Sequence, residues 1–227
     1  MILYKLKELI RWHIEPKIMS LFLRPNSNCK SIDLGLAIIP EELLSQNAIS
    51  YSIGVGEDIE FELELQSKYV VNQWLFDPTP RTIEFMSNQS MPTDRIQFMP
   101  FGIWKDDSNQ FFQAPMIKTH VSHAINSTSK SNLLGFEAVC RSLPSIMKQL
   151  GHEHIHLLKM NVEGVEDIIL ENALSAGIRP DIIVVTWEGK RALLKAIRWT
   201  LRLKSLGWDF LGRKGWYFTY TKSCETK

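Results

Sequence analysis

The sequence has few cysteines, and their spacing excludes two common kinds of site. Its 227 residues contain Cys29, Cys140 and Cys224, which lie far apart and form no CxxC pair. Such spacing predicts neither a disulfide framework nor a zinc site. The default expectation is a reducing compartment, so we predict a cytoplasmic protein without a bound metal.

The sequence also lacks a charge bias and long apolar runs. Its formal net charge is only +1, whereas electrostatic capture of nucleic acid needs a clustered basic surface. We therefore expect no nucleic-acid partner. No apolar run is long enough to cross a bilayer. Charges interrupt every apolar stretch of the N-terminus, which argues against a signal peptide.

The chain does have an amphipathic N-terminus and enough apolar residues for a core. Residues 1–30 have the spacing of an amphipathic helix with a basic face. Such a helix usually packs against its own protein, and the alternative is weak contact with an anionic membrane surface. The remaining residues, 31–227, suit one domain, and the apolar content of 44% can supply its core. The oligomeric state is not predicted.

From Ile49 onward, short apolar runs alternate with helical patterns, which predicts parallel strands joined by crossover helices. A polar region rich in Ser and Asn interrupts this alternation and is predicted to be irregular. A hairpin closes the chain, with Arg213 and Lys214 between its strands. The predicted core strands are 49–55, 71–76, 95–104, 155–162 and 181–187, with a short strand at 136–143; the helices are 58–69, 78–88, 144–151, 166–177 and 190–207; the irregular region is 105–135; and the hairpin strands are 208–212 and 215–221.

Ligands of an open parallel sheet bind outside the carboxyl ends of its strands. Gly54 and Gly56 follow the first strand, but Ile59 replaces the third glycine of a dinucleotide fingerprint. Asp58 can cap the next helix and would repel a pyrophosphate. Asp77 follows the second strand, about twenty residues on, a spacing at which an acid can bind ribose hydroxyls. These residues fit a nucleoside that carries an amine, such as S-adenosylmethionine, or else an ordinary strand–turn–helix.

The later strands offer further polar groups at the same edge. Lys159, Asn161 and Glu163 alternate with apolar residues in "LLKMNVEG", and Glu188 follows the fifth strand. Glu163 either contributes to a site or only stabilises a helix N-terminus.

Histidines occur in two groups. His120 and His123 lie in the predicted irregular region, where a histidine can act as a general base on a hydroxyl. His152, His154 and His156 alternate in "GHEHIHLL", which favours the polar start of a strand over a metal site.

With these residues in place, the chain resembles the FkbM-like family of S-adenosylmethionine-dependent methyltransferases. The matching segments are "SIGVGEDIEFELEL", "WLFDPTPRTIEF", "FMPFGIW", "HVSHAI", "LGHEHIHLLKMNVEG" and "PDIIVVTWE". The resemblance implies an α/β class I methyltransferase fold. This is a three-layer Rossmann-like sandwich with a mostly parallel seven-stranded sheet, whose last strand is antiparallel.

The resemblance also implies the activity and its residues. The expected function is methyl transfer to a hydroxyl of a sugar, glycan or secondary metabolite. The base candidates, in falling order, are His123, His120, Glu163 and Glu188, and the cofactor-binding candidates are Gly54, Gly56, Asp58, Asp77, Pro78 and Asn161.

One residue departs from the family pattern. The family usually reads "KMDIEG" or "KIDVEG" where this chain reads "KMNVEG", so Asn161 replaces an aspartate. An amide keeps the shape but weakens a charge-assisted hydrogen bond. A non-catalytic binding or scaffold protein is therefore the main alternative. A nicotinamide-dependent oxidoreductase is a further one, which Ile59 and Asp58 disfavour.

Overall fold

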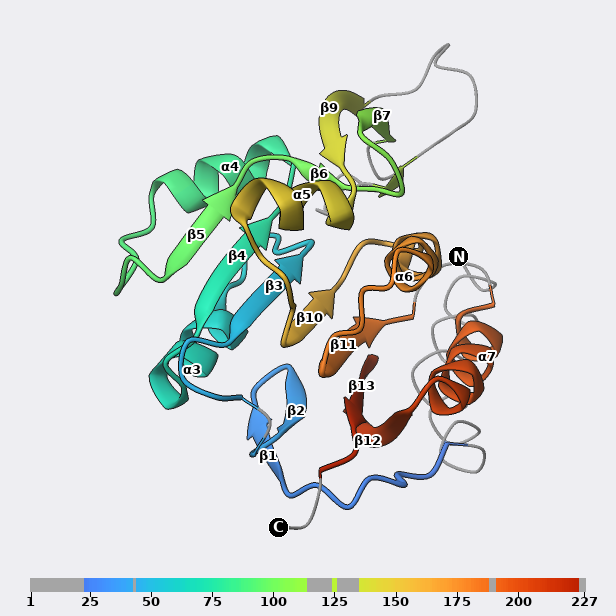
Figure 1. The fold of residues 1–227 in the computed structure, drawn as a ribbon. Coiled ribbons are helices and arrows are strands. Elements are labelled where there is room, and N and C mark those ends of the chain that lie inside the picture. Colours follow the sequence, from blue (N-terminus) through green and yellow to red (C-terminus); the bar gives the residue numbers. More distant parts are fainter. Residues whose placement is uncertain (1–22, 43, 114–123, 126–134, 188–190, 225–227) are drawn as a thin grey trace, which may run out of the picture.

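The centre of the structure, a computed structural model, is a seven-stranded mixed sheet (Figure 1). The described residues are 23–42, 44–113, 124–125, 135–187 and 191–224. The strand order in this sheet is β12-β13-β11-β10-β3-β4-β5. Its strands are β3 (Ile49–Ile53), β4 (Asn72–Phe76), β5 (Ile96–Met99), β10 (Leu157–Met160), β11 (Ile182–Thr186), β12 (Trp208–Lys214) and β13 (Tyr217–Lys222).

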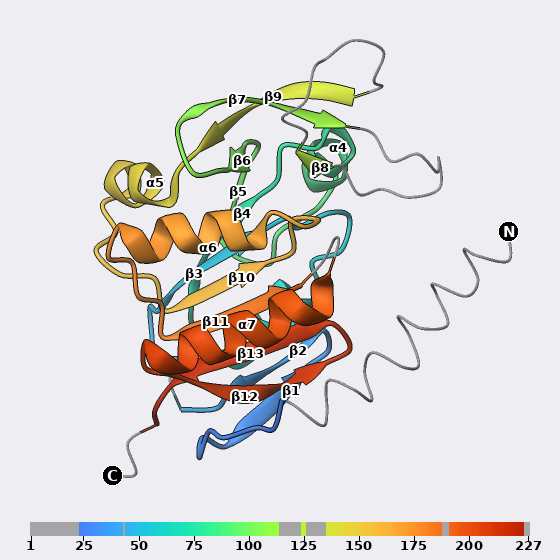
Figure 2. The same cartoon turned by 90° about the vertical axis from the view of Figure 1, so that its right-hand side faces the viewer.

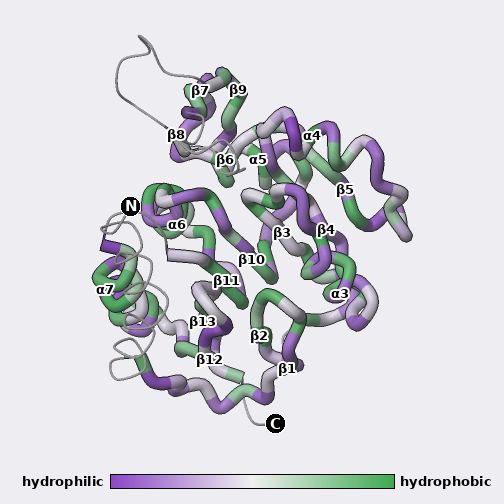
Figure 3. The backbone as a smooth tube through the Cα atoms, turned by 180° about the vertical axis from the view of Figure 1, so that it is seen from behind, coloured by the Kyte–Doolittle hydropathy of each residue, from purple (hydrophilic) through white to green (hydrophobic). Residues whose placement is uncertain are grey.

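The sheet is mostly parallel, as the sequence predicts. β5, β4, β3, β10 and β11 run parallel to their neighbours within this group. β13 is antiparallel to both β11 and β12. The prediction of seven strands with an antiparallel last strand is therefore confirmed. β10 and β11, in the middle of the sheet, consist largely of hydrophobic residues (Figure 3). This composition is typical of strands covered on both faces.

Alternation along the strands separates two apolar layers. On one face of the sheet, Leu158 belongs to an apolar cluster that includes residues of α5 (Leu143–Leu150), α6 (Glu166–Ser175) and α7 (Ala192–Ser205). Figure 2 shows these three helices in front of the sheet. On the other face, Leu157 joins a cluster with Phe61, because adjacent strand residues point to opposite sides. The elements on that second face are α3 (Glu60–Lys68), α4 (Pro80–Ser87), and a hairpin of β1 (Ser31–Leu34) and β2 (Ala37–Pro40).

The predicted end of α5 is confirmed, whereas α4 begins two residues later than predicted. Pro80 occupies the first turn of α4, where its missing N–H costs nothing. Gly151 closes α5 in the left-handed conformation, at φ 70°, which is typical of a glycine at a helix C-terminus. Helix α3 begins at Glu60, two residues later than predicted.

The predictions of one strand over 95–104 and of an irregular region over 105–135 were partly wrong. Residues of both segments form part of a second, four-stranded sheet. The predicted strand divides at Pro100, which has no N–H for a ladder. Its first part is β5, and its last part is β6 of the second sheet, which has the order β6-β9-β7-β8. The strands are β6 (Gly102–Ile103), β7 (Ser108–Gln113), β8 (Ala124–Ile125) and β9 (Gly135–Arg141).

Two hairpins also differ from the sequence analysis. β12 continues through Lys214, so the turn before β13 lies at Gly215 and not at Arg213 and Lys214. Gly215 has φ 56°, a conformation that glycine adopts without strain. The β1–β2 hairpin was not predicted, because its strands have four residues each and their alternation is too short to recognise.

The cysteine prediction was wrong, because Cys29 and Cys224 form a disulfide. Their sequence separation is 195 residues, yet their Cα atoms lie 5.3 Å apart. Spacing along the chain carries no information on such a pairing. The third cysteine, Cys140, is free and buried. The expectation of a reducing compartment therefore loses its basis in cysteine usage.

The N-terminal helical prediction falls mostly on residues 1–22, which lie outside the described residues. Leu23 is buried in the cluster that contains α6 and α7. Within the described ranges, none of the helices combines the length and the apolar character needed to cross a bilayer.

Reduction of the Cys29–Cys224 disulfide is expected to destabilise the protein by about 2–5 kcal/mol, because the bond closes a long loop in the unfolded chain. Thermal unfolding with and without dithiothreitol measures the difference. The double variant Cys29→Ser/Cys224→Ser is the control, and its melting temperature should not respond to the reductant. Equal stability of the oxidised and reduced protein would contradict the expectation.

Candidate functional site

A cavity of about 310 Å³ lies where β3, β4 and β10 end. Residues that follow these three strands line it, together with residues of α4 and of the second sheet. The sequence-predicted residues at this cavity are Gly54, Gly56, Asp58, Asp77, Pro78, Asn161 and Glu163. The structure therefore brings together seven of the ten predicted site residues.

Gly54 and Gly56 form the turn between β3 and α3. Both favour glycine through their backbone conformation, and Gly54 also lacks space for a side chain. Both have positive φ, 75° and 65°, which L side chains rarely adopt. A Cβ on Gly54 would lie 1.9 Å from the Asn161 carbonyl oxygen. A Cβ on Gly56 would meet no atom within 4 Å. Gly54 therefore allows two loops to touch, whereas Gly56 leaves its side of the turn open.

The Asp77 carboxylate connects two of the loops around the cavity. Its Oδ2 accepts a hydrogen bond from the Gly56 N–H at 3.0 Å, and its Oδ1 accepts one from the Thr79 N–H at 2.8 Å. The side chain is 5% exposed. A carboxylate has about four acceptor positions, so each oxygen retains capacity for a further donor. Asp77 can thus hold the glycine turn and bind a ligand hydroxyl together.

The acids of the β3–α3 loop have partners of their own. Asp58 Oδ1 accepts a hydrogen bond from the Glu60 N–H at 2.9 Å, which is the local turn bond of an aspartate to a backbone two residues on. The N-cap of α3 is Ile59, and α3 has no side-chain cap, so Asp58 does not occupy the predicted capping position. Glu57 pairs with Arg81 of α4 at 2.8 Å. Ile59 is buried among apolar residues of the α4 side. An isoleucine at this position thus contributes to the core, where a dinucleotide fingerprint has glycine.

Two polar residues at the end of β10, Lys159 and Asn161, have different partners. Asn161 accepts a hydrogen bond from Thr186 at 2.8 Å and donates one to the Tyr217 hydroxyl at 3.3 Å. Lys159 does not belong to the cavity; it points to α3 and pairs with Glu62 at 2.7 Å, where both side chains are almost fully buried. Lys159 and Asn161 therefore both hold β10 in its place, and of the two only Asn161 also lines the cavity.

Glu163 lies on the β10–α6 loop with φ 57°. A left-handed conformation is strained for a glutamate, and Gly164 follows it at φ 101°. The side chain is half-buried at the cavity. It is one of the four base candidates, and the other three, His120, His123 and Glu188, lie outside the described residues.

Sequence reasoning missed the cavity wall that α4 and the second sheet supply. Thr82 of α4 is 1% exposed, and its hydroxyl has no partner among the described residues. Phe112 of β7 lines the cavity next to Gly102, since a Cβ on Gly102 would lie 3.2 Å from its ring. Pro78 is the third neighbour there, at 3.4 Å. No sequence signal placed β7 near Pro78, because the contact depends on the second sheet.

The three alternating histidines lie away from this cavity. His154 Nε2 is 2.8 Å from Asp181, and His156 Nδ1 accepts a hydrogen bond from the Ile49 N–H at 2.9 Å. These two histidines and Asp181 could hold a metal by proximity. However, Asp181 also pairs with Lys222 at 3.1 Å, and a neutral imidazole that accepts at Nδ1 carries its proton on Nε2. The hydrogen bonding thus favours a structural role.

His152 is half-buried next to the other two histidines. Its Nδ1 lies 2.7 Å from the Tyr51 hydroxyl, and its ring packs edge-on to Trp74. Burial lowers the pKa of His152 and raises that of Tyr51. Both groups therefore stay neutral near pH 7, as a buried polar contact requires.

One comparison with known proteins identifies a family. The family model of the methyltransferase FkbM domain matches residues 11–206, which include every residue placed at the cavity. No match to the chain was found among curated proteins.

The two glycines of the turn are expected to respond differently to alanine. Gly54→Ala should destabilise the protein by about 3 kcal/mol or more, since strain adds to a clash with the Asn161 carbonyl. Gly56→Ala should cost about 1–2 kcal/mol, from the positive φ alone. Urea unfolding of both variants measures the two values. Equal losses would contradict the close approach at Gly54.

Proposed function

Because the chain belongs to the methyltransferase FkbM family, we propose that it is an S-adenosylmethionine-dependent O-methyltransferase with a class I, Rossmann-like methyltransferase fold. The acceptor in this proposal is a hydroxyl of a sugar, glycan or secondary metabolite. The family indicates a methyltransferase. The cofactor and the acceptor are the proposed parts.

The charge of the cavity is the observation that carries the cofactor proposal. Four acids line it, and no basic side chain is among the described residues that do so. Phosphate groups would be repelled there, whereas a sulfonium and an ammonium group would be attracted. The acids are Glu57, Asp58, Asp77 and Glu163. Glu57 is paired with Arg81 of α4, so the excess negative charge of the lining comes from Asp58, Asp77 and Glu163.

The residues present fit such a cofactor in four further respects. Gly56 leaves open space beside the turn, Asp77 retains acceptor positions for ribose hydroxyls, and Thr82 has an unpartnered hydroxyl at the wall. Apolar side chains such as Ile103 and Phe112 line the same cavity and suit the faces of a base. When bound, S-adenosylmethionine would supply an activated methyl group on sulfur.

The chain's own contribution to the reaction would be positioning and removal of a proton. An acceptor hydroxyl must lie close to the methyl group and in line with the bond that breaks, and a base must take its proton. Glu163 is the base candidate within the described cavity. His123, His120 and Glu188 remain candidates for the same role.

The two alternatives are less well supported. A nicotinamide-dependent oxidoreductase would place a pyrophosphate near Asp58 and Ile59, where the acid repels it and the buried Ile59 replaces the third glycine of a dinucleotide fingerprint. A non-catalytic scaffold was suggested by Asn161. The hydrogen bonds of Asn161 to Thr186 and Tyr217 show that the amide is accommodated at the strand end, which weakens that suggestion.

Asp77→Asn is expected to weaken S-adenosylmethionine binding at least about tenfold, because an amide offers one acceptor atom where the carboxylate offers two. Isothermal titration calorimetry measures the affinity, with NAD as a ligand expected to give no heat. Asp94→Asn, a change at an acid outside the cavity lining, is the control. Absence of heat with the wild-type protein would reject the cofactor proposal, and an unchanged affinity in Asp77→Asn would reject this role of Asp77.

Thr82→Val is expected to affect stability and binding in opposite directions. Valine removes a buried hydroxyl without a partner, so the free energy of unfolding without ligand should stay the same or rise by about 1 kcal/mol. If the hydroxyl turns to bond a ligand, affinity should fall about fivefold. Thr200→Val is the control, since its hydroxyl bonds Ala196 and Tyr220, and it should lose stability but not affinity. Destabilisation by Thr82→Val would contradict the unpartnered state.

A further inference from the structure

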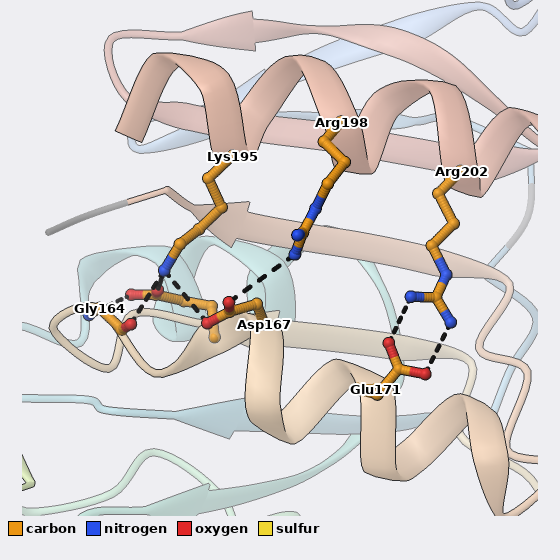
Figure 4. Close-up of polar contacts among 7 residues, drawn as sticks. Gly164, Asp167, Glu171, Lys195, Arg198 and Arg202 are labelled. Atoms are coloured by element: carbon orange, nitrogen blue, oxygen red, sulfur yellow. Dashed lines mark hydrogen bonds and ion pairs between the residues drawn. The ribbon is translucent and has the colours of Figure 1, made fainter. Parts of the chain in front are cut away.

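Helices α6 and α7 are joined by a row of charged contacts (Figure 4). Arg202 binds Glu171 through two hydrogen bonds, and Arg198 lies 3.9 Å from Asp167. Lys195 is the third cation of the row, one turn nearer the start of α7. Its side chain is 13% exposed, compared with 68% for Arg198 and 40% for Arg202.

Lys195 differs from the two arginines because it reaches the loop before α6. Its Nζ donates to the Gly164 carbonyl at 2.9 Å and to Asp167 Oδ1 at 3.1 Å. The Glu166 carboxylate is 3.6 Å away. Glu166 in turn accepts a hydrogen bond from the Gly164 N–H at 2.8 Å. Both backbone polar groups of Gly164 are therefore held, one directly by Lys195 and one by the acid beside it.

This part of the loop needs external support. Glu163 has a positive φ, which is strained for a residue with a side chain, and strained backbone persists only where surrounding contacts impose it. Glu166 is fully buried. Burial raises the pKa of its carboxyl, whereas the Gly164 N–H and Lys195 lower it. Loss of Lys195 would leave a buried acid without its cation, which is strongly unfavourable.

The same loop forms one wall of the cavity. Asn161, Val162, Glu163 and Val165 all line it, and Lys195 itself does not. We propose that Lys195 is a positioning residue, which fixes the β10–α6 loop in the conformation that shapes the cavity wall and orients Glu163. The identity of the ligand rests on the proposed function, whereas the effect on the loop does not.

The first test compares amide hydrogen exchange without ligand in the full-length protein. Lys195→Met should increase exchange at the Gly164 amide, which bonds Glu166, at least about tenfold, a change of about 1.4 kcal/mol in local opening. Arg202→Met is the matched control, because it breaks a contact between the same two helices but away from the loop. It should leave this amide within about twofold of wild type. Unchanged exchange in Lys195→Met, or an equal increase in Arg202→Met, would overturn the proposal.

The second test measures S-adenosylmethionine affinity in the same variants. Lys195→Met should weaken binding about tenfold, whereas Arg202→Met should lower the melting temperature without changing affinity. Lys195→Arg retains a charged donor and should restore both loop protection and affinity to within about threefold. If Lys195→Met does not fold, Lys195→Gln serves in its place, since a neutral amide keeps one donor but loses the charge.

The two proposals fail in different ways. A wild-type protein that does not bind S-adenosylmethionine would reject the proposed cofactor but leave the exchange result for Lys195 valid. Normal loop protection in Lys195→Met and Lys195→Gln would reject the role of Lys195 whatever the ligand is. Affinity lost equally in Arg202→Met would assign the effect to the helix interface in general and also overturn the proposal.

Discussion

The cavity depends on the contact between two backbones, the β3–α3 turn at Gly54 and the end of β10 at Asn161. The space that a side chain at position 54 would occupy contains the Asn161 carbonyl. Two loops can come this close only if one of them has no Cβ. Because adjacent parallel strands end at one edge, the contact brings the glycine turn against the loop that carries Glu163. The Asp77 carboxylate then connects the turn to the third strand end.

The segment from Lys159 to Gly164 is held from several sides. Lys159 pairs with Glu62 of α3, Asn161 bonds Thr186 of β11 and Tyr217 of β13, and Gly164 is held by Lys195. A buried ion pair adds little net stability but is costly to break, so it favours one register over alternatives. Most of the polar side chains in this motif therefore fix the strand end.

The sequence predicted the part of the site that follows from strand order alone. Gly54, Gly56 and Asp77 each come directly after an apolar run, and parallel strands place such residues at a common edge. The second sheet was not predicted, because the polar residues of β7 hide its alternation. Its contribution to the cavity, Phe112 beside Gly102, is a tertiary contact with no local signal. The Cys29–Cys224 disulfide was missed for the same reason, since it joins the two ends of the domain.

Asn161 shows how a departure from a family pattern can be judged from its partners. Its oxygen accepts from the Thr186 hydroxyl, and its nitrogen donates to the Tyr217 hydroxyl. An aspartate could accept hydrogen bonds from both hydroxyls, because hydroxyl groups donate as well as accept. The exchange thus preserves the number of hydrogen bonds and removes one negative charge. Four acids still line the cavity, so its preference for a cationic ligand does not depend on residue 161. The substitution therefore bears on the strength of binding and not on the sign of the charge that the cavity selects.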